Sequence, residues 1–290
     1  MTKYSIRKNW IDTFGLIKNK PIVLLPFVFI AFFEALALEL TYFYSRFPIS
    51  KIAGPIIKKF FGEGYMHYPG NLIILPKIFY ALQVAIYILF GVLLTGACVN
   101  IFNSLKENLP VRAKAVLKNA LKHYGAFILY GLFMMALFLL LRKAEVTLFS
   151  KIVRFAGRYL PVPQEFYQFS ISAILFLSNI ILQVFFVLTV PILVLEHRAI
   201  LKAIFRSIYL GARNFFTIFS LLFLPFLLYL PISLLKSFST ELISRTFPEI
   251  TVCITAIGIV AAIYIDCFVI ISVSQFLLHI KKSEPAKKLK

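Results

Sequence analysis

The chain of 290 residues alternates between long apolar stretches and short connections that carry most of its Lys and Arg. A helix needs about 20 mostly apolar residues to cross a hydrocarbon core of ~30 Å. The stretches do not alternate apolar and polar residues as barrel strands do, and backbone groups in lipid must be bonded internally. The sequence therefore predicts an all-α polytopic membrane protein with six transmembrane helices, at 21–44, 72–104, 125–141, 171–195, 216–235 and 251–278.

Three connections have the pattern of amphipathic helices that lie along a membrane surface. They span 4–18, 111–124 and 198–214. In the second and third, basic residues recur at every fourth position on one helical stripe, and the pattern of 4–18 is similar but rougher. Such elbow helices either rest on anionic lipid headgroups or present a docking surface to an acidic partner. The residues predicted to make these contacts are Lys114, Lys118, Lys122, Arg198, Lys202, Arg206 and Arg213.

The order of segments repeats three times within a single transmembrane domain, 1–290. The predicted units are 1–104, 105–195 and 196–290, each with an elbow helix, a span, an outer amphipathic segment and a returning span. Ser-Lys-Ile opens the outer segment at 50–52 and again at 150–152, and 237–247 forms a shorter third one. Three consecutive helical hairpins of this kind would be related by an axis along the membrane normal.

Composition and charge exclude a soluble protein and orient the chain. Hydrophobic residues make up 60% and charged residues 15%, whereas soluble domains carry about 25% charged residues. The formal charge of +19 therefore does not indicate a soluble nucleic-acid binder. Most Lys and Arg lie near the termini and in 105–124 and 196–215. The positive-inside rule then predicts a multi-pass protein of the cell (plasma or inner) membrane with both termini cytoplasmic.

Ionisable residues inside a span are costly and mark candidate functional sites. Glu34 and Asp266 fall at similar depth near the midplane of the first and last spans. Together they would share a proton or hold a cation, with Gln83, Gln183 or Tyr264 as polar neighbours. The alternative is that each carboxyl group is neutral or hydrogen-bonded to a neighbouring helix.

A second pair of ionisable residues suggests a structural role. Glu39 and Lys77 each lie five residues from the outer end of helices joined by one connection, so antiparallel packing would form an ion pair. Lys77 could instead reach out to the headgroups.

Prolines mark the expected helix breaks. Pro191, Pro225 and Pro231 interrupt the fourth and fifth spans, and broken helices often line cavities. The simpler interpretation is a kink relieved by neighbouring helices, because proline is common in membrane spans. Metal-ligand spacings and nucleophile motifs are missing from the sequence, so no metal, cofactor or enzymatic activity is expected.

Two short motifs stand at the start of the chain and from the end of the fourth span onward. The first comprises Trp10, Phe14, Lys18-Asn19-Lys20-Pro21 and Leu24-Leu25-Pro26, and the second Pro191, Glu196, Lys202-Ala203, Arg206-Ser207, Gly211 and Asn214-Phe215. Together they resemble the membrane domain that is fused to some glycerophosphodiester phosphodiesterases. The resemblance implies a six-helix domain with helical elbows. The catalytic domain of those enzymes has no counterpart in these residues, so their activity is not implied.

We therefore expect a non-enzymatic membrane protein that binds or translocates a small or amphiphilic molecule, with lipids included. The alternative is a membrane scaffold that recruits partners through its basic elbow helices.

Overall fold

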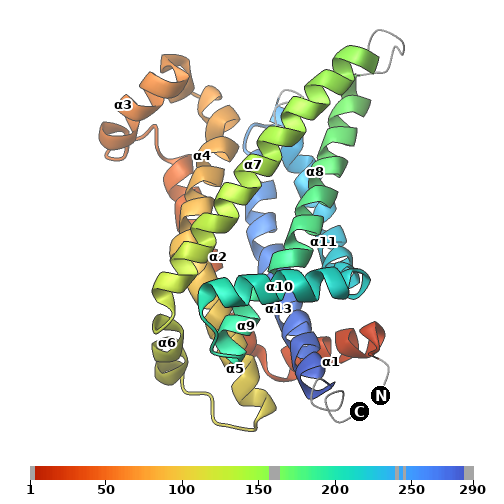
Figure 1. Ribbon diagram of the computed structural model, residues 1–290. Coiled ribbons are helices and arrows are strands. Elements are labelled where there is room, and N and C mark those ends of the chain that lie inside the picture. Colours follow the sequence, from red (N-terminus) through yellow and green to blue (C-terminus); the bar gives the residue numbers. More distant parts are fainter. Residues whose placement is uncertain (1–3, 157–163, 239–241, 244–245, 284–290) are drawn as a thin grey trace.

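The computed structural model of the chain describes residues 4–156, 164–238, 242–243 and 246–283 (Figure 1). Among these residues it is built from helices, without a strand, and six helical segments are long and apolar enough to cross a membrane. The segments are Pro21–Tyr42, Gly70–Lys106, Tyr124–Glu145, Ala173–Leu195, Phe215–Lys236 and Ile250–Lys282. The predicted six-helix membrane fold is confirmed.

Some spans are single helices and others are built from two or three pieces. α7 (Tyr124–Ala156), α11 (Phe215–Ser237) and α13 (Ile250–Ser283) are continuous. The composite spans are η1 with α2 (Pro21–Leu24, Leu25–Tyr42), α4 with η3 and α5 (Gly70–Ile86, Tyr87–Gly91, Val92–Lys106), and α8 with α9 (Gln164–Phe186, Thr189–Leu195).

The three elbow helices form as predicted and lie at the end of the bundle where α13 ends, which we call the terminal face (Figure 1). They are α1 (Ile6–Asn19), α6 (Ala113–Leu121) and α10 (Ile200–Arg213). The amphipathic helix α3 (Ser50–Phe61), followed by the short turn η2 (Glu63–Met66), lies at the opposite end.

The elbow helix α10 packs a face of small residues against α8 and exposes several of its large apolar ones. Ser207 donates a hydrogen bond to the carbonyl of Phe185 at 2.7 Å, and a Cβ added at Gly211 would lie 2.8 Å from the Val184 carbonyl oxygen. The residues that face outward are Leu201, Phe205 and Tyr209. An apolar face left outside the protein core is typical of a helix at a membrane interface.

The outer segments of the three units differ. The first is the separate helix α3, whereas α7 continues without interruption to Ala156. The prediction of a separate amphipathic segment opening at residue 150 is therefore wrong. Residues 142–156 contain neither Gly nor Pro, so nothing ends the helix there. The third segment, 237–247, lies partly outside the described residues.

The prolines act differently from the prediction in one span. α11 runs through Pro225 and Pro231 as one helix, so the breaks expected there do not form. Neighbouring helices can compensate the lost backbone hydrogen bonds of a membrane proline. The break near Pro191 does form, because α8 ends at Phe186 and α9 begins at Thr189. Proline cannot donate to the carbonyl four residues earlier, here that of Val187.

Candidate functional site

A buried carboxyl group lies within the helix bundle at Glu34. The residue is on α2, which packs against α4 and α13, and only 7% of its surface is exposed. Gln83 on α4 donates a hydrogen bond from Nε2 to Glu34 Oε1 at 2.8 Å. Gln83 is one of the three polar neighbours that the sequence suggested for the carboxyl groups, and it is the one bonded to Glu34. The amide partner is neutral, so this hydrogen bond leaves the charge of an ionised Glu34 uncompensated.

Lys236 turns into the bundle although it is the last residue of the fifth span. Its Nζ donates a hydrogen bond to the hydroxyl of Tyr229 at 3.2 Å, and the ammonium group interacts electrostatically with Glu34. Gly258 on α13 provides the space for this conformation, since a Cβ there would lie 3.0 Å from Lys236 Nζ. The fifth span predicted from the sequence ends at residue 235, so Lys236 falls in the outer connection, where a lysine usually extends toward the headgroups.

Asp266 on α13 belongs to the same group of residues. Its carboxyl group is half-buried and interacts electrostatically with Glu34. Among the described residues, Glu34 is hydrogen-bonded to Gln83 through its side chain and is not hydrogen-bonded to Asp266. Tyr87 and Tyr229 both interact electrostatically with Asp266. We call Glu34, Gln83, Tyr229, Lys236 and Asp266 the intramembrane cluster.

Two predicted neighbours of the carboxyl groups lie elsewhere. Tyr264 is on α13 but 58% of its surface is exposed, so it faces away from the bundle. Gln183 is on α8, which packs chiefly against α10 and α11 rather than against α2. A residue's depth in the membrane follows from the sequence, whereas the direction of its side chain depends on how the helices pack.

A π-helical turn, η3, interrupts the second span beside the cluster. Tyr87 begins the turn and Gly91 ends it, and a Cβ at Gly91 would lie 2.5 Å from the Tyr87 ring. The glycine therefore lets the tyrosine ring lie against the backbone. π-turns inside α-helices occur frequently at functional sites. The sequence carries no strong signal for this turn, because the surrounding residues are uniformly apolar.

The ion pair predicted between Glu39 and Lys77 does not form. Both residues are described and exposed, on α2 and α4, and neither takes part in an ion pair. Their helices do pack together, but both side chains are exposed. The alternative expectation, that Lys77 extends toward the headgroups, agrees with this exposure.

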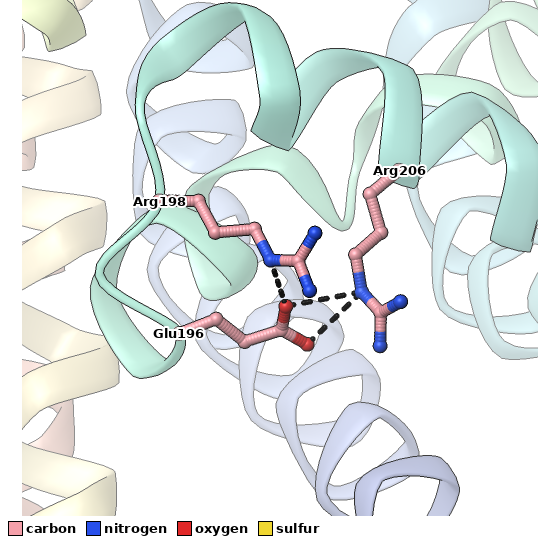
Figure 2. Close-up of polar contacts among 3 residues, drawn as sticks. All are labelled: Glu196, Arg198 and Arg206. Carbon is pink, nitrogen blue, oxygen red and sulfur yellow. Dashed lines mark hydrogen bonds and ion pairs between the residues drawn. The ribbon is translucent and has the colours of Figure 1, made fainter. Parts of the chain in front are cut away.

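A second buried carboxyl group lies at the terminal face, where the sequence predicted only basic contacts. The Glu196 side chain is 7% exposed and is held between two arginines (Figure 2). Glu196 Oε2 lies 2.6 Å from Arg198 Nε and 3.0 Å from Arg206 Nε, and Arg206 Nε donates to Oε1 at 3.1 Å. We call these three residues the Glu196 clamp. Two of the basic residues predicted to contact headgroups therefore pair with a carboxylate of the protein itself.

The other predicted headgroup contacts are exposed. They lie on α6 and its end and on α10, at Lys114, Lys118, Lys122, Lys202 and Arg213. Arg213 has no acidic partner among the described residues, and its Nη1 donates a hydrogen bond to the Tyr209 hydroxyl at 3.4 Å. This exposed set retains the positive surface that the sequence predicted.

Two histidines stack beside the Glu196 clamp. The rings of His123 and His197 are 6.4 Å apart between centroids, and His197 has a positive φ of 51°. A non-glycine residue in this conformation is uncommon and is held by its surroundings. Burial lowers the pKa of His123, and the nearby His197 and Lys122 lower it further. His123 therefore favours its neutral form in the folded protein.

The residues that the structure describes contain no group of three or more His, Cys, Asp or Glu placed to hold a metal ion.

Comparisons with protein-family models, with curated proteins and with solved structures find no match. The fold and the intramembrane cluster define the class to which the chain belongs, a multi-pass helical membrane protein with ionisable groups between its spans.

Proposed function

We propose that the chain is a non-enzymatic integral membrane protein that binds or translocates a small or amphiphilic molecule, with lipids included. The observation that carries this proposal is the intramembrane cluster, in which Glu34 is buried between spans with a neutral amide as its hydrogen-bond donor. An ionisable group at the centre of a bilayer costs at least about 2.5–3.5 kcal/mol. Such a cost is commonly retained where the group contacts a ligand.

The side chains around Glu34 suit the polar end of an amphiphile. Gln83 and Tyr229 offer amide and hydroxyl groups, and Lys236 and Asp266 offer charges of opposite sign. The exposed apolar residues on the outside of the bundle would remain against lipid. A polar headgroup at the cluster and an apolar tail along the helices would match this distribution.

The orientation proposed for the chain places the terminal face in the cytoplasm of a cell (plasma or inner) membrane. Both the elbow helices and the ends of the described chain lie at that face, and their exposed lysines would contact anionic headgroups. Each basic residue at such a surface contributes about 1 kcal/mol of attraction. The resemblance to the membrane domain fused to phosphodiesterases fits the same proposal of a six-helix domain with basic elbows.

Native mass spectrometry of the purified protein tests the proposed ligand binding. Wild-type protein should retain a copurified small molecule or lipid, and Glu34→Gln should reduce its occupancy at least about tenfold, which corresponds to about 1.4 kcal/mol. Glu39→Gln is the matched control, because Glu39 lies on the same helix but is exposed. Equal occupancy in the wild type and both variants would contradict the proposal.

A scaffold that recruits an acidic partner is the second candidate. It is favoured by the three lysines of 114–122, which are all exposed and carry no ion pair among the described residues. Replacing Lys114, Lys118 and Lys122 by Gln should then remove a protein partner from crosslinked membranes. Retention of that partner, together with weaker binding to anionic vesicles, would assign the lysines to lipid instead.

A further inference from the structure

We propose that Glu34, Asp266 and Lys236 form a site that holds one exchangeable proton within the membrane. Lys236 compensates the charge of one carboxylate, and the proton neutralises the other. This inference rests on the proposed function, because it assigns a proton to the same intramembrane cluster. Binding of the proposed ligand at the cluster would then depend on whether the carboxyl group is protonated.

The polar and charged groups around Glu34 and Asp266 come from four helical elements. From α4 comes the neutral amide of Gln83, and from η3 the phenol of Tyr87 lies near Asp266. α11 contributes Lys236 and the phenol of Tyr229, and α13 contributes Asp266. Glu39 on α2 itself is exposed.

Two carboxylates and one ammonium leave one negative charge in excess when all three groups are ionised. An uncompensated buried charge is strongly destabilising, whereas a proton on one carboxyl oxygen removes it. The step forms one O–H bond and takes one proton from water, and no other bond changes.

The inward conformation of Lys236 is part of the fold. Its Nζ is 3.2 Å from the hydroxyl of Tyr229, which lies about two helical turns earlier on α11 and therefore further from the end of the span. The absence of a side chain at Gly258 leaves room for both groups, since a Cβ would lie 3.0 Å from the lysine nitrogen and 3.1 Å from the tyrosine oxygen. Lys236 is therefore a fixed interior cation rather than a headgroup anchor.

The donors around Glu34 favour a proton over a metal ion. Gln83 directs an amide N–H at Oε1, and Lys236, which is itself a cation, donates to Tyr229 within the same cluster, whereas hard cations such as Ca²⁺ require six or more oxygen ligands. The described residues also lack a group of three or more acidic, His or Cys ligands. A protonated carboxyl group, by contrast, needs only one acceptor.

Infrared spectroscopy of the full chain in phosphatidylcholine–phosphatidylglycerol nanodiscs at pH 7 tests the proposal. The wild type should show the carbonyl band of one protonated carboxyl group per chain, and the band should shift in D₂O. Glu34→Gln combined with Asp266→Asn should abolish it. Lys236→Met should double its amplitude, because removal of the ammonium requires a second proton.

Control variants keep the test independent of folding and of the proposed ligand. Lys77→Met removes an exposed lysine from α4 and should leave the band unchanged, and Lys236→Arg should preserve a single band. A wild type without the band, a band that survives the double substitution, or an amplitude unchanged in Lys236→Met would overturn the proposal. Loss of the band on adding NaCl at constant pH would overturn the proposal and indicate that the site binds a sodium ion. Copurified ligand in a wild type that lacks the band would reject the proton while leaving the proposed function intact.

Discussion

Glu34 and Glu196 each bury their carboxyl group, with 7% of the Glu34 residue and 7% of the Glu196 side chain exposed, but they have opposite surroundings. Glu196 lies at the terminal face between the guanidinium groups of Arg198 and Arg206, within 3.1 Å of both. Glu34 lies inside the bundle, where its hydrogen-bond donor is the neutral amide of Gln83 and its cation, Lys236, interacts with it electrostatically.

The difference separates a structural carboxylate from a candidate functional one. A hydrogen bond and ion pair with Arg206 and an ion pair with Arg198 fix the position and the charge of Glu196, so it joins the end of α9 to α10. One neutral donor fixes the position of Glu34 but not its charge. A carboxyl group whose ionisation state is not fixed by charged partners can change that state when a ligand or a proton binds.

The largest effect is expected from breaking the Glu196 clamp. Arg206→Met should destabilise the protein by about 3 kcal/mol, because it removes the more buried cation from a buried carboxylate. Reversible unfolding in mixed micelles would measure the change. Arg198→Met is the control, since Arg198 is 41% exposed and its loss should cost less than about 1 kcal/mol. Equal effects of the two substitutions would contradict the asymmetry of the clamp.

A much smaller effect on stability is expected at the cluster. Glu34→Gln should change the free energy of unfolding by less than about 1 kcal/mol, because the amide keeps the shape of the side chain and needs no compensating charge. The same unfolding assay applies, with Glu39→Gln as the exposed reference on α2. A loss as large as that of Arg206→Met would show that Glu34 is structural, and the contrast between the two glutamates would fail.

The smallest effect is a pH dependence beside the clamp. The pKa of His123 is lowered in the folded protein, chiefly by burial, so protonation favours the unfolded state. The stabilisation should be fully present above the unfolded pKa of about 6.5 and should decrease as the pH falls below it toward the folded pKa. His123→Asn should flatten the dependence of the unfolding midpoint on pH in that window. A wild-type midpoint that rises as the pH falls there would reverse the sign and reject the prediction.

Hydrophobic patterning determined most of the fold. The six spans, the three elbow helices and the depth of Glu34 were predictable because each depends on the local order of apolar and polar residues. Gln83 was also one of the three polar neighbours suggested from the sequence, since its contact needed only neighbouring helices and a shared depth. Helix ends were predicted less well, and α7 passed its expected end because no breaker follows.

Helix packing alone decided which side chains meet. A helix of nearly uniform apolar composition has no preferred face, so the sequence did not show that Tyr264 faces outward or that Glu39 and Lys77 stay exposed and unpaired. Likewise, the inward turn of Lys236 depends on the gap at Gly258, a residue 22 positions away on another helix. The spans thus follow from local composition, which the sequence contains directly. The intramembrane cluster and the Glu196 clamp depend on contacts between segments, which only the tertiary structure establishes.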